Sequence, residues 1–217
     1  MTGTFRRLAA TTAYPWIVFV KICGITTEED ALLAVAMGAD AVGFNFVAGS
    51  VRQVAVDHAR DISRRLPPEV LTVGIFRDEA PERVVDLCHR ADLRAAQLHG
   101  QESPDVAATV RARVGQVIKV FPAGSRAAAD IDRYDVDAVM LDGLVPGSGE
   151  IFDWALVDVV PDDVPFILAG GLTPDNVVAA IERVRPWGVD VATGVESSAG
   201  HKDPIKVRDF VKRAKGE

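Results

Sequence analysis

The sequence predicts a single eight-stranded α/β barrel, the (β/α)8 or TIM-barrel fold, from three observations. Short apolar runs alternate with amphipathic helical patterns along the chain, without hairpin turn signals, and this alternation is typical of parallel βαβ units. The 217 residues allow eight units of about 27 residues each, near the lower size limit of such barrels. The chain is 48% hydrophobic, which is enough for one sizeable core.

Eight apolar runs supply the predicted strands, at residues 17–22, 41–46, 70–76, 94–98, 116–121, 137–141, 165–169 and 188–192. We expect residues 18–217 to form the barrel domain, and residues 1–17 to form an N-terminal extension that leads into the first strand. Residues 6–20 also contain the arginines and the apolar run of a signal peptide. The extension is favoured, because polar residues interrupt that run and cleavage after it would remove the first strand.

Two helices have clear start signals. Thr26 and Glu29 have the spacing of a capping box, and we expect the stripe Leu32, Val35, Ala36 and Ala39 to be buried. Thr173 is the predicted N-cap of a later helix, with Pro174 at its first position. The predicted buried face of that helix is Val177, Val178, Ile181 and Val184.

Four strand entries resemble one another, with lead aspartates Asp40, Asp92, Asp137 and Asp190. They recur at intervals of roughly two units, which marks the even-numbered strands. Two interpretations stay open: a true internal repeat, or a small-residue-then-Asp turn that simply connects a helix well to a strand.

Charge and cysteine content restrict the partners and the compartment. The net charge is −7 and the basic residues are scattered, so nucleic acid and anionic membranes are not expected as main partners. No segment approaches the roughly 18 apolar residues that a membrane span requires. Cys23 and Cys88 lack the spacing of a zinc site, so no metal is expected, and two isolated thiols indicate a reducing, cytoplasmic location.

Glycines follow the last two predicted strands. In such barrels, functional groups lie at the C-terminal ends of the strands, and the loops after strands 7 and 8 commonly bind phosphate. Gly170 and Gly171 precede the helix that begins at Thr173, and Gly194 opens the last loop. Helix N-termini favour anions, so these loops predict a phosphate site. A tight turn is the alternative. The segment "VESSAG" suits a short extra helical turn.

The first strand ends in a cysteine preceded by a lysine. Side chains alternate along a strand, so Lys21 and Cys23 point the same way. A cationic neighbour lowers a thiol's pKa, and a thiolate is a usable base; the alternative is a small apolar filler. An inward-pointing Lys21 requires a carboxylate, and we expect Asp190 of the eighth strand to supply it.

Three further side chains stand at strand ends or in the loops that follow. Asp142 ends an apolar strand, where burial raises a carboxyl's pKa and suits it to donate a proton; alternatively it caps the next segment. Arg52 can bind a carboxylate through its forked donors, or be a solvated loop residue. His99 either contacts substrate or bonds to backbone. Residues 143–150 are a long βα loop that could act as a lid.

These residues lie in motifs that together resemble the phosphoribosylanthranilate isomerase family. The motifs, in chain order, are "KICGIT", "DALLAVAMGADAVGFNF", "SVRQV", "QLHGQE", "LDG…GSGEIFDW", "AGGLTPDNV" and "GVDVATGVESSAGHKD". The resemblance covers nearly the whole chain from residue 18. It implies a (β/α)8 barrel that acts in tryptophan biosynthesis, without a metal or organic cofactor, on a small phosphorylated substrate.

The resemblance also implies residue roles. Cys23 would be the general base and Asp142 the general acid of an Amadori rearrangement of N-(5-phosphoribosyl)anthranilate. Arg52 would bind the anthranilate carboxylate, and the loops around Gly171 and Gly194 would bind the phosphate. Thr193 stands where the family usually has serine and keeps the hydroxyl.

One departure and two alternatives accompany this resemblance. The second-strand loop reads "AGSVRQV" where "SPRYV" or a similar sequence is expected, which could loosen the anthranilate end. A related or bifunctional histidine-pathway isomerase is one alternative, although that chemistry typically uses aspartate at the position of Cys23. A non-catalytic barrel that binds a phosphorylated ligand is the other. Monomer and homodimer both stay open.

Overall fold

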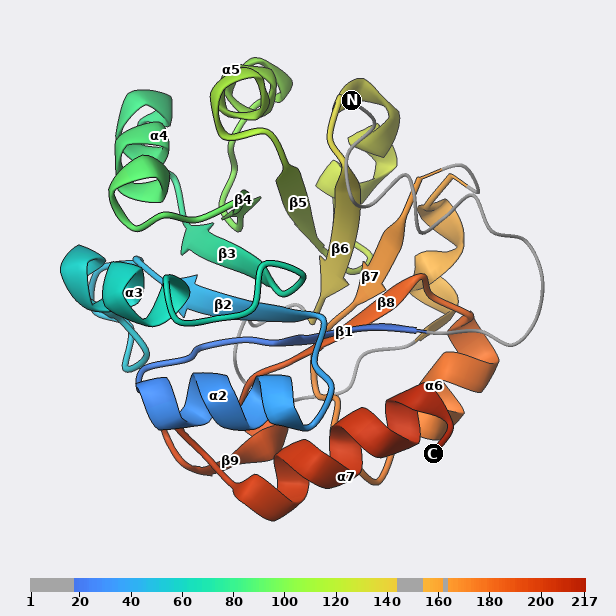
Figure 1. Ribbon diagram of the computed structural model, residues 1–217. Helices are drawn as coiled ribbons and strands as arrows, with labels where there is room; N and C mark the ends of the chain where they lie inside the picture. Colours follow the sequence, from blue (N-terminus) through green and yellow to red (C-terminus); the bar gives the residue numbers. More distant parts are fainter. Residues whose placement is uncertain (1–17, 144–153, 162–163) are drawn as a thin grey trace.

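The predicted fold class is confirmed by a computed structural model, which describes residues 18–143, 154–161 and 164–217. Eight parallel strands close into a barrel in the order of the chain, with the helices outside it (Figure 1). The strands are β1 Phe19–Ile22, β2 Ala41–Asn45, β3 Leu71–Phe76, β4 Ala95–Leu98, β5 Val117–Pro122, β6 Ala138–Asp142, β7 Phe166–Leu168 and β8 Gly188–Val191. Each lies within its predicted range, except that β5 and β6 extend one residue further.

The helices that follow the strands differ in type along the chain. The α-helices are α2 Glu28–Ala36, α3 Val56–Ser63, α4 Pro81–Arg90, α5 Pro104–Val114, α6 Val177–Val184 and α7 Pro204–Lys215. The 3-10 helices η1 Arg126–Arg133 and η2 Trp154–Val159 follow β5 and β6. After β8 come the short 3-10 turn η3 Thr193–Val195 and the two-stranded sheet of β9 Glu196–Ser198 and β10 His201–Lys202. The extra helical turn is therefore at Thr193–Val195, and not in "VESSAG" as predicted.

Helix α2 corrects two predictions. Its N-cap is Thr27, whose Oγ1 accepts a hydrogen bond from the Asp30 N–H at 3.2 Å, whereas the Thr26 hydroxyl donates to the Gly200 carbonyl. The predicted stripe is half right: Ala39 is buried and Val35 packs against the core, but Leu32 is 43% exposed and Ala36 is exposed, while Ala31 and Ala34 are buried instead. After the acidic first turn every residue of the helix is apolar, so periodicity could not select a face, and the small alanines let it lie close to the sheet.

Helix α6 begins later than predicted. Its first residue is Val177 and its N-cap is Asn176. Thr173 instead starts a turn, in which its Oγ1 accepts from the Asp175 N–H at 3.2 Å and its own N–H donates to Asn176 Oδ1 at 2.8 Å. Val177 is buried, and Ile181 and Val184 pack against the core, but Val178 is 42% exposed. Because these turn residues make their hydrogen bonds with one another, the helix begins only at Val177.

Two of the four lead aspartates share one structural role. Asp40 Oδ2 accepts from the Val20 N–H at 2.8 Å, and Asp137 Oδ2 accepts from the Val117 N–H at 2.9 Å. Each carboxylate thus joins the start of an even strand to the odd strand before it. Asp92 lies three residues before the first residue of β4 in a left-handed conformation. Asp190, in contrast, lies inside β8, so it is not an entry residue. The even-numbered strand assignment is confirmed.

The barrel interior changes from apolar to charged toward the C-terminal ends of the strands. Phe19 lies at the start of β1, where its ring stacks on Trp187 with centroids 4.5 Å apart. Lys21 follows it on the inward side and pairs in register with Asp190 of β8. The charged residues therefore lie directly beneath the face on which barrel active sites form.

The predicted extension at residues 1–17, and residues 144–150 of the predicted loop, lie outside the described residues. The domain boundary at residue 18 stays a prediction. Within the described ranges, every helix is too short or too polar to cross a membrane.

Candidate active site

A cavity of about 560 Å³ opens at the C-terminal ends of the strands. All eight residues predicted to act in catalysis or substrate binding line it: Cys23, Arg52, His99, Asp142, Gly170, Gly171, Thr193 and Gly194. Asp190 lines it too, and Lys21 is fully buried below. Ser50 and Gln97, which also stand in the loop after strand 2 and at the end of strand 4, line the cavity too, whereas the sequence reasoning missed Asn45 and Arg77. Asn45 and Arg77 lie at or just beyond strand ends, which is the signal that could have found them.

The lysine in the first strand has the partner predicted from the sequence. Lys21 Nζ donates to Asp190 Oδ1 at 2.8 Å. Lys21 Nζ and Cys23 Sγ both lie against Gly43 of β2, and a Cβ atom at that glycine would be 3.2 Å from each. A larger residue at position 43 would therefore clash with both the thiol and the ammonium group.

The Cys23 thiol has a raised pKa in this structure, which differs from the sequence expectation. Burial raises the pKa, the Lys21 ammonium lowers it, the Asp190 carboxylate raises it and the Lys202 ammonium lowers it. The predicted effect of Lys21 is present, but burial outweighs it. The Lys21 pKa is also raised on balance: burial lowers it, and the interactions with Asp190 and Cys23 together raise it more.

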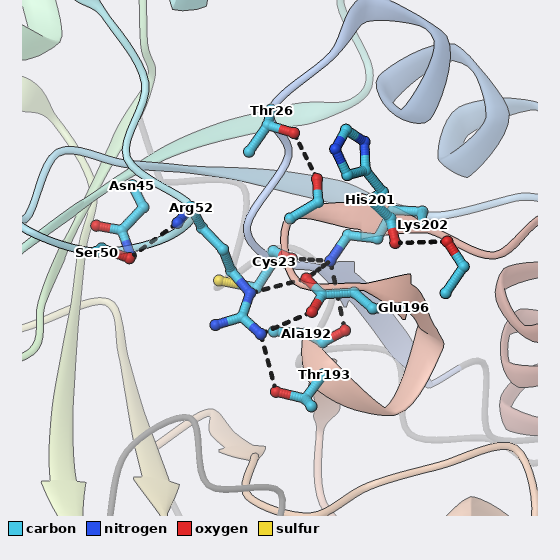
Figure 2. Close-up of polar contacts among 12 residues, drawn as sticks. Cys23, Thr26, Asn45, Ser50, Arg52, Ala192, Thr193, Glu196, His201 and Lys202 are labelled. Carbon is cyan, nitrogen blue, oxygen red and sulfur yellow. Dashed lines mark hydrogen bonds and ion pairs between the residues drawn. The ribbon is translucent and has the colours of Figure 1, made fainter.

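Arg52 is held by a carboxylate that the sequence reasoning did not single out. Its Nε and Nη2 donate to the two oxygens of Glu196, each at 2.7 Å, and Nη2 also donates to Thr193 Oγ1 at 3.1 Å (Figure 2). Its side chain lies over Gly24, where a Cβ atom would collide with it. Arg52 is thus an anchored residue and not a freely solvated one.

Lys202 completes this network from β10. Its Nζ donates to Glu196 Oε1 at 3.0 Å, to the Cys23 carbonyl at 2.7 Å and to the Ala192 carbonyl at 3.4 Å. Burial lowers the Lys202 pKa, although Glu196 opposes the shift. Glu196 and Lys202 both lie in the motif segment "GVESSAGHKD". Their opposite charges beside a glycine loop are the signal from which the sequence could have identified them.

Asp142 and His99 lie close together in the wall of the cavity. Asp142 is 8% exposed, and its Oδ1 accepts from the Gly143 N–H at 2.8 Å. Its Oδ2 lies 3.3 Å from His99 Nε2. The other ring nitrogen, Nδ1, is 3.2 Å from Gln97 Nε2. Among the described residues, the His99 ring nitrogens thus lie near side chains of the site, and no hydrogen bond from the ring to backbone is present.

The glycine loops after β7 and β8 leave no room for side chains. Gly170 and Gly171 have φ values of +85° and +66°. A Cβ atom at Gly170 would lie 2.5 Å from the Gly143 nitrogen, and one at Gly194 would overlap the Leu172 carbonyl oxygen. The two loops thus meet backbone to backbone, and only glycine fits at positions 170 and 194.

Comparison with known proteins identifies the family. The sequence profile described as "N-(5'phosphoribosyl)anthranilate (PRA) isomerase" matches residues 20–213. The N-(5'-phosphoribosyl)anthranilate isomerase of Desulforudis audaxviator is 48% identical over 92% of this chain and 98% of its own length. The crystal structure of the Thermus thermophilus enzyme has a TM-score of 0.85 at 43% identity, covering 90% of this chain and 98% of that one.

A second solved structure is a phosphoribosyl anthranilate isomerase in complex with reduced 1-(o-carboxyphenylamino)-1-deoxyribulose 5-phosphate. It has a TM-score of 0.82 at 40% identity and covers 92% of this chain and all of its own. The profile match over residues 20–213 includes Cys23, Asp142 and the glycine loops. The chain therefore belongs to the N-(5'-phosphoribosyl)anthranilate isomerase family.

Proposed function

We propose that this chain converts N-(5-phosphoribosyl)anthranilate into 1-(2-carboxyphenylamino)-1-deoxyribulose 5-phosphate by an Amadori rearrangement. The observation that carries the proposal is the placement of Cys23 and Asp142 at the ends of β1 and β6, lining one cavity. An aldose-to-ketose shift requires an acid and a base at separate points of one pocket. Family membership supports the same reaction.

Asp142 is the proposed general acid. It protonates the ring oxygen as the furanose opens, which leaves a cationic imine between the sugar C1 and the anthranilate nitrogen. The carboxyl group is 8% exposed and lies beside His99, so the ring is placed to replace or orient the acid's proton.

Cys23 is the proposed general base. It removes the proton from C2 of the imine, and the bonding electrons move to the nitrogen to give an enolamine. Tautomerisation then places a proton on C1 and leaves the C2 ketone, so the atoms and electrons balance without an external oxidant. Although burial raises the thiol pKa, the cationic imine makes the C2 proton acidic, and the ammonium groups of Lys21 and Lys202 favour the thiolate.

The two anionic ends of the substrate have separate proposed sites. The backbone of Gly170, Gly171 and Gly194 binds the phosphate. Arg52 binds the anthranilate carboxylate, supported by its forked donors and its position on the cavity wall. Lys21 and Asp190 support the base from below.

A spectroscopic assay with N-(5-phosphoribosyl)anthranilate tests the reaction. Wild type is expected to turn over, and Cys23→Ala and Asp142→Asn are each expected to abolish turnover while circular dichroism stays unchanged. Full activity in either variant would refute the mechanism. The histidine-pathway aminoaldose is expected to be a poor substrate, because a thiol replaces the aspartate typical of that chemistry.

Location and assembly are also proposals. The free thiols of Cys23 and Cys88 support a reducing, cytoplasmic location. A solved relative at 38% identity is described as monomers generated from the dimeric Thermotoga maritima enzyme, so we propose either a monomer or a homodimer. Light scattering during size-exclusion chromatography distinguishes them.

A further inference from the structure

Glu196 is a buried carboxylate shared by two cations. Its side chain is 4% exposed, and it accepts from Nε and Nη2 on one edge of the Arg52 guanidinium and from Lys202 Nζ (Figure 2). Burial raises its pKa, but Arg52 and Lys202 lower it further, so the net shift is downward. The carboxylate is therefore ionised at neutral pH. Its single negative charge faces the two positive charges of Arg52 and Lys202, so the cluster has a net positive charge.

The geometry leaves one side of the Arg52 guanidinium available. An arginine has five N–H donors in a rigid plane. Glu196 accepts from Nε and from Nη2, and Thr193 Oγ1 accepts from Nη2. Among the described residues, no hydrogen bond to Nη1 is present, so its two N–H groups are the donors available to a ligand. The Arg52 side chain is 15% exposed and lines the cavity.

Lys202 fixes Glu196 relative to the proposed base. Its ammonium group is fully buried and donates to the carbonyl oxygens of Cys23 and Ala192. Lys202 Nζ thus contacts the residues that follow β1 and β8 as well as the Glu196 carboxylate that binds Arg52. A shift of the Glu196 carboxylate would break its bond to Lys202, the residue that also bonds the Cys23 carbonyl.

We propose that Glu196, anchored by Lys202, is a positioning residue that orients Arg52 toward the carboxylate of the bound substrate. Glu196 occupies the Nε edge and so directs Nη1 into the cavity. The unpaired positive charge of the three-residue cluster then favours an anionic group at this end. This inference rests on the proposed function, because it takes the carboxylate to be that of the anthranilate ring.

Calorimetry with two ligands tests the proposal. One ligand is reduced 1-(o-carboxyphenylamino)-1-deoxyribulose 5-phosphate, and the other is its anilino analogue without the carboxylate. Glu196→Gln keeps the side-chain shape and is expected to weaken the first ligand about 10- to 100-fold, a range that corresponds to about 1.4 to 2.8 kcal/mol. The analogue is expected to lose less than about threefold, because it does not use Arg52.

The matched control is Glu28→Gln, which breaks a surface ion pair in which Arg65 Nη1 donates to both Glu28 oxygens, and it is expected to change neither affinity. A loss of equal size for both ligands would overturn the proposal, because it would assign the effect to the phosphate end or to general stability. Unchanged affinity for both would also overturn it. The wild-type turnover assay separates these outcomes from failure of the proposed function.

A double-mutant cycle gives a second readout. In an Arg52→Gln background, Glu196→Gln is expected to have less than about threefold further effect on the carboxylate ligand. The same loss in both backgrounds would show that Glu196 acts independently of Arg52. If Glu196→Gln does not fold, Arg52→Lys keeps the charge but loses the fork, and the same carboxylate-selective loss is expected.

Discussion

Replacing Lys21 with methionine tests the charged layer beneath the active site. Lys21 is fully buried, and its partner Asp190 is only 8% exposed. The variant leaves that carboxylate without its 2.8 Å partner. Removing one member of a buried pair costs about 3–5 kcal/mol. For a chain of this size, that loss lowers the unfolding midpoint by roughly 6–20 °C, measured by circular dichroism at pH 7.

The pH dependence of this loss has a definite sign. The folded-state pKa of Lys21 is raised above its ordinary value of 10.5, since Asp190 and Cys23 outweigh the burial that lowers it. The stabilisation by the ammonium group is therefore fully present below pH 10.5 and is lost as the pH rises through the higher folded-state pKa. The difference in midpoint between wild type and Lys21→Met should stay constant from neutral pH to that limit.

Alkylation of Cys23 gives an independent readout of the same substitution. Because Lys21 lowers the thiol pKa, its removal should slow reaction with iodoacetamide at mildly alkaline pH, about tenfold for each unit of increase in the thiol pKa. Cys88 interferes little, since burial raises its pKa to about 12.

Lys119→Met is the matched control. It breaks another buried pair, with Glu102 at 2.8 Å, and should lower stability without changing Cys23 alkylation. Equal slowing in both variants, or an unchanged midpoint in Lys21→Met, would refute the reasoning. Combining Lys21→Met with Asp190→Leu should recover most of the stability, because no buried charge is left unpaired.

Three further predictions concern other parts of the barrel. Gly194→Ala would place a methyl group on the Leu172 carbonyl and should raise the KM for the phosphorylated substrate at least about tenfold by displacing the loop; unchanged steady-state kinetics would argue against the phosphate site. Asp137→Ala leaves the Val117 N–H without its acceptor and should lower the free energy of unfolding by about 1–3 kcal/mol in urea, with Asp135→Ala on the surface as the control. His99→Ala should reduce kcat more than KM if the ring serves Asp142, and a change in KM alone would instead place it against the substrate's binding groups.

The sequence by itself predicted the strands and the site, because both depend on local pattern. Buried parallel strands are continuous apolar runs, and in a barrel the residues at their C-terminal ends all face one cavity. Cys23, His99 and Asp142 could therefore be assigned to one site from their positions along the chain. Alternation along β1 likewise placed Lys21 on the inward side, and the need for a buried counter-charge pointed to Asp190.

Tertiary structure decided what depends on distance between segments remote in the chain. The bond from Arg52 to Glu196 spans 144 residues, and no local pattern encodes it. The thiol pKa was predicted from one neighbour, but it depends on the balance between burial and several charges. The buried face of α2 was also partly misplaced, because the residues after its acidic first turn are all apolar and the packing around them selects the buried side. Local rules assign residue types to positions, whereas burial and charge pairing depend on the whole barrel.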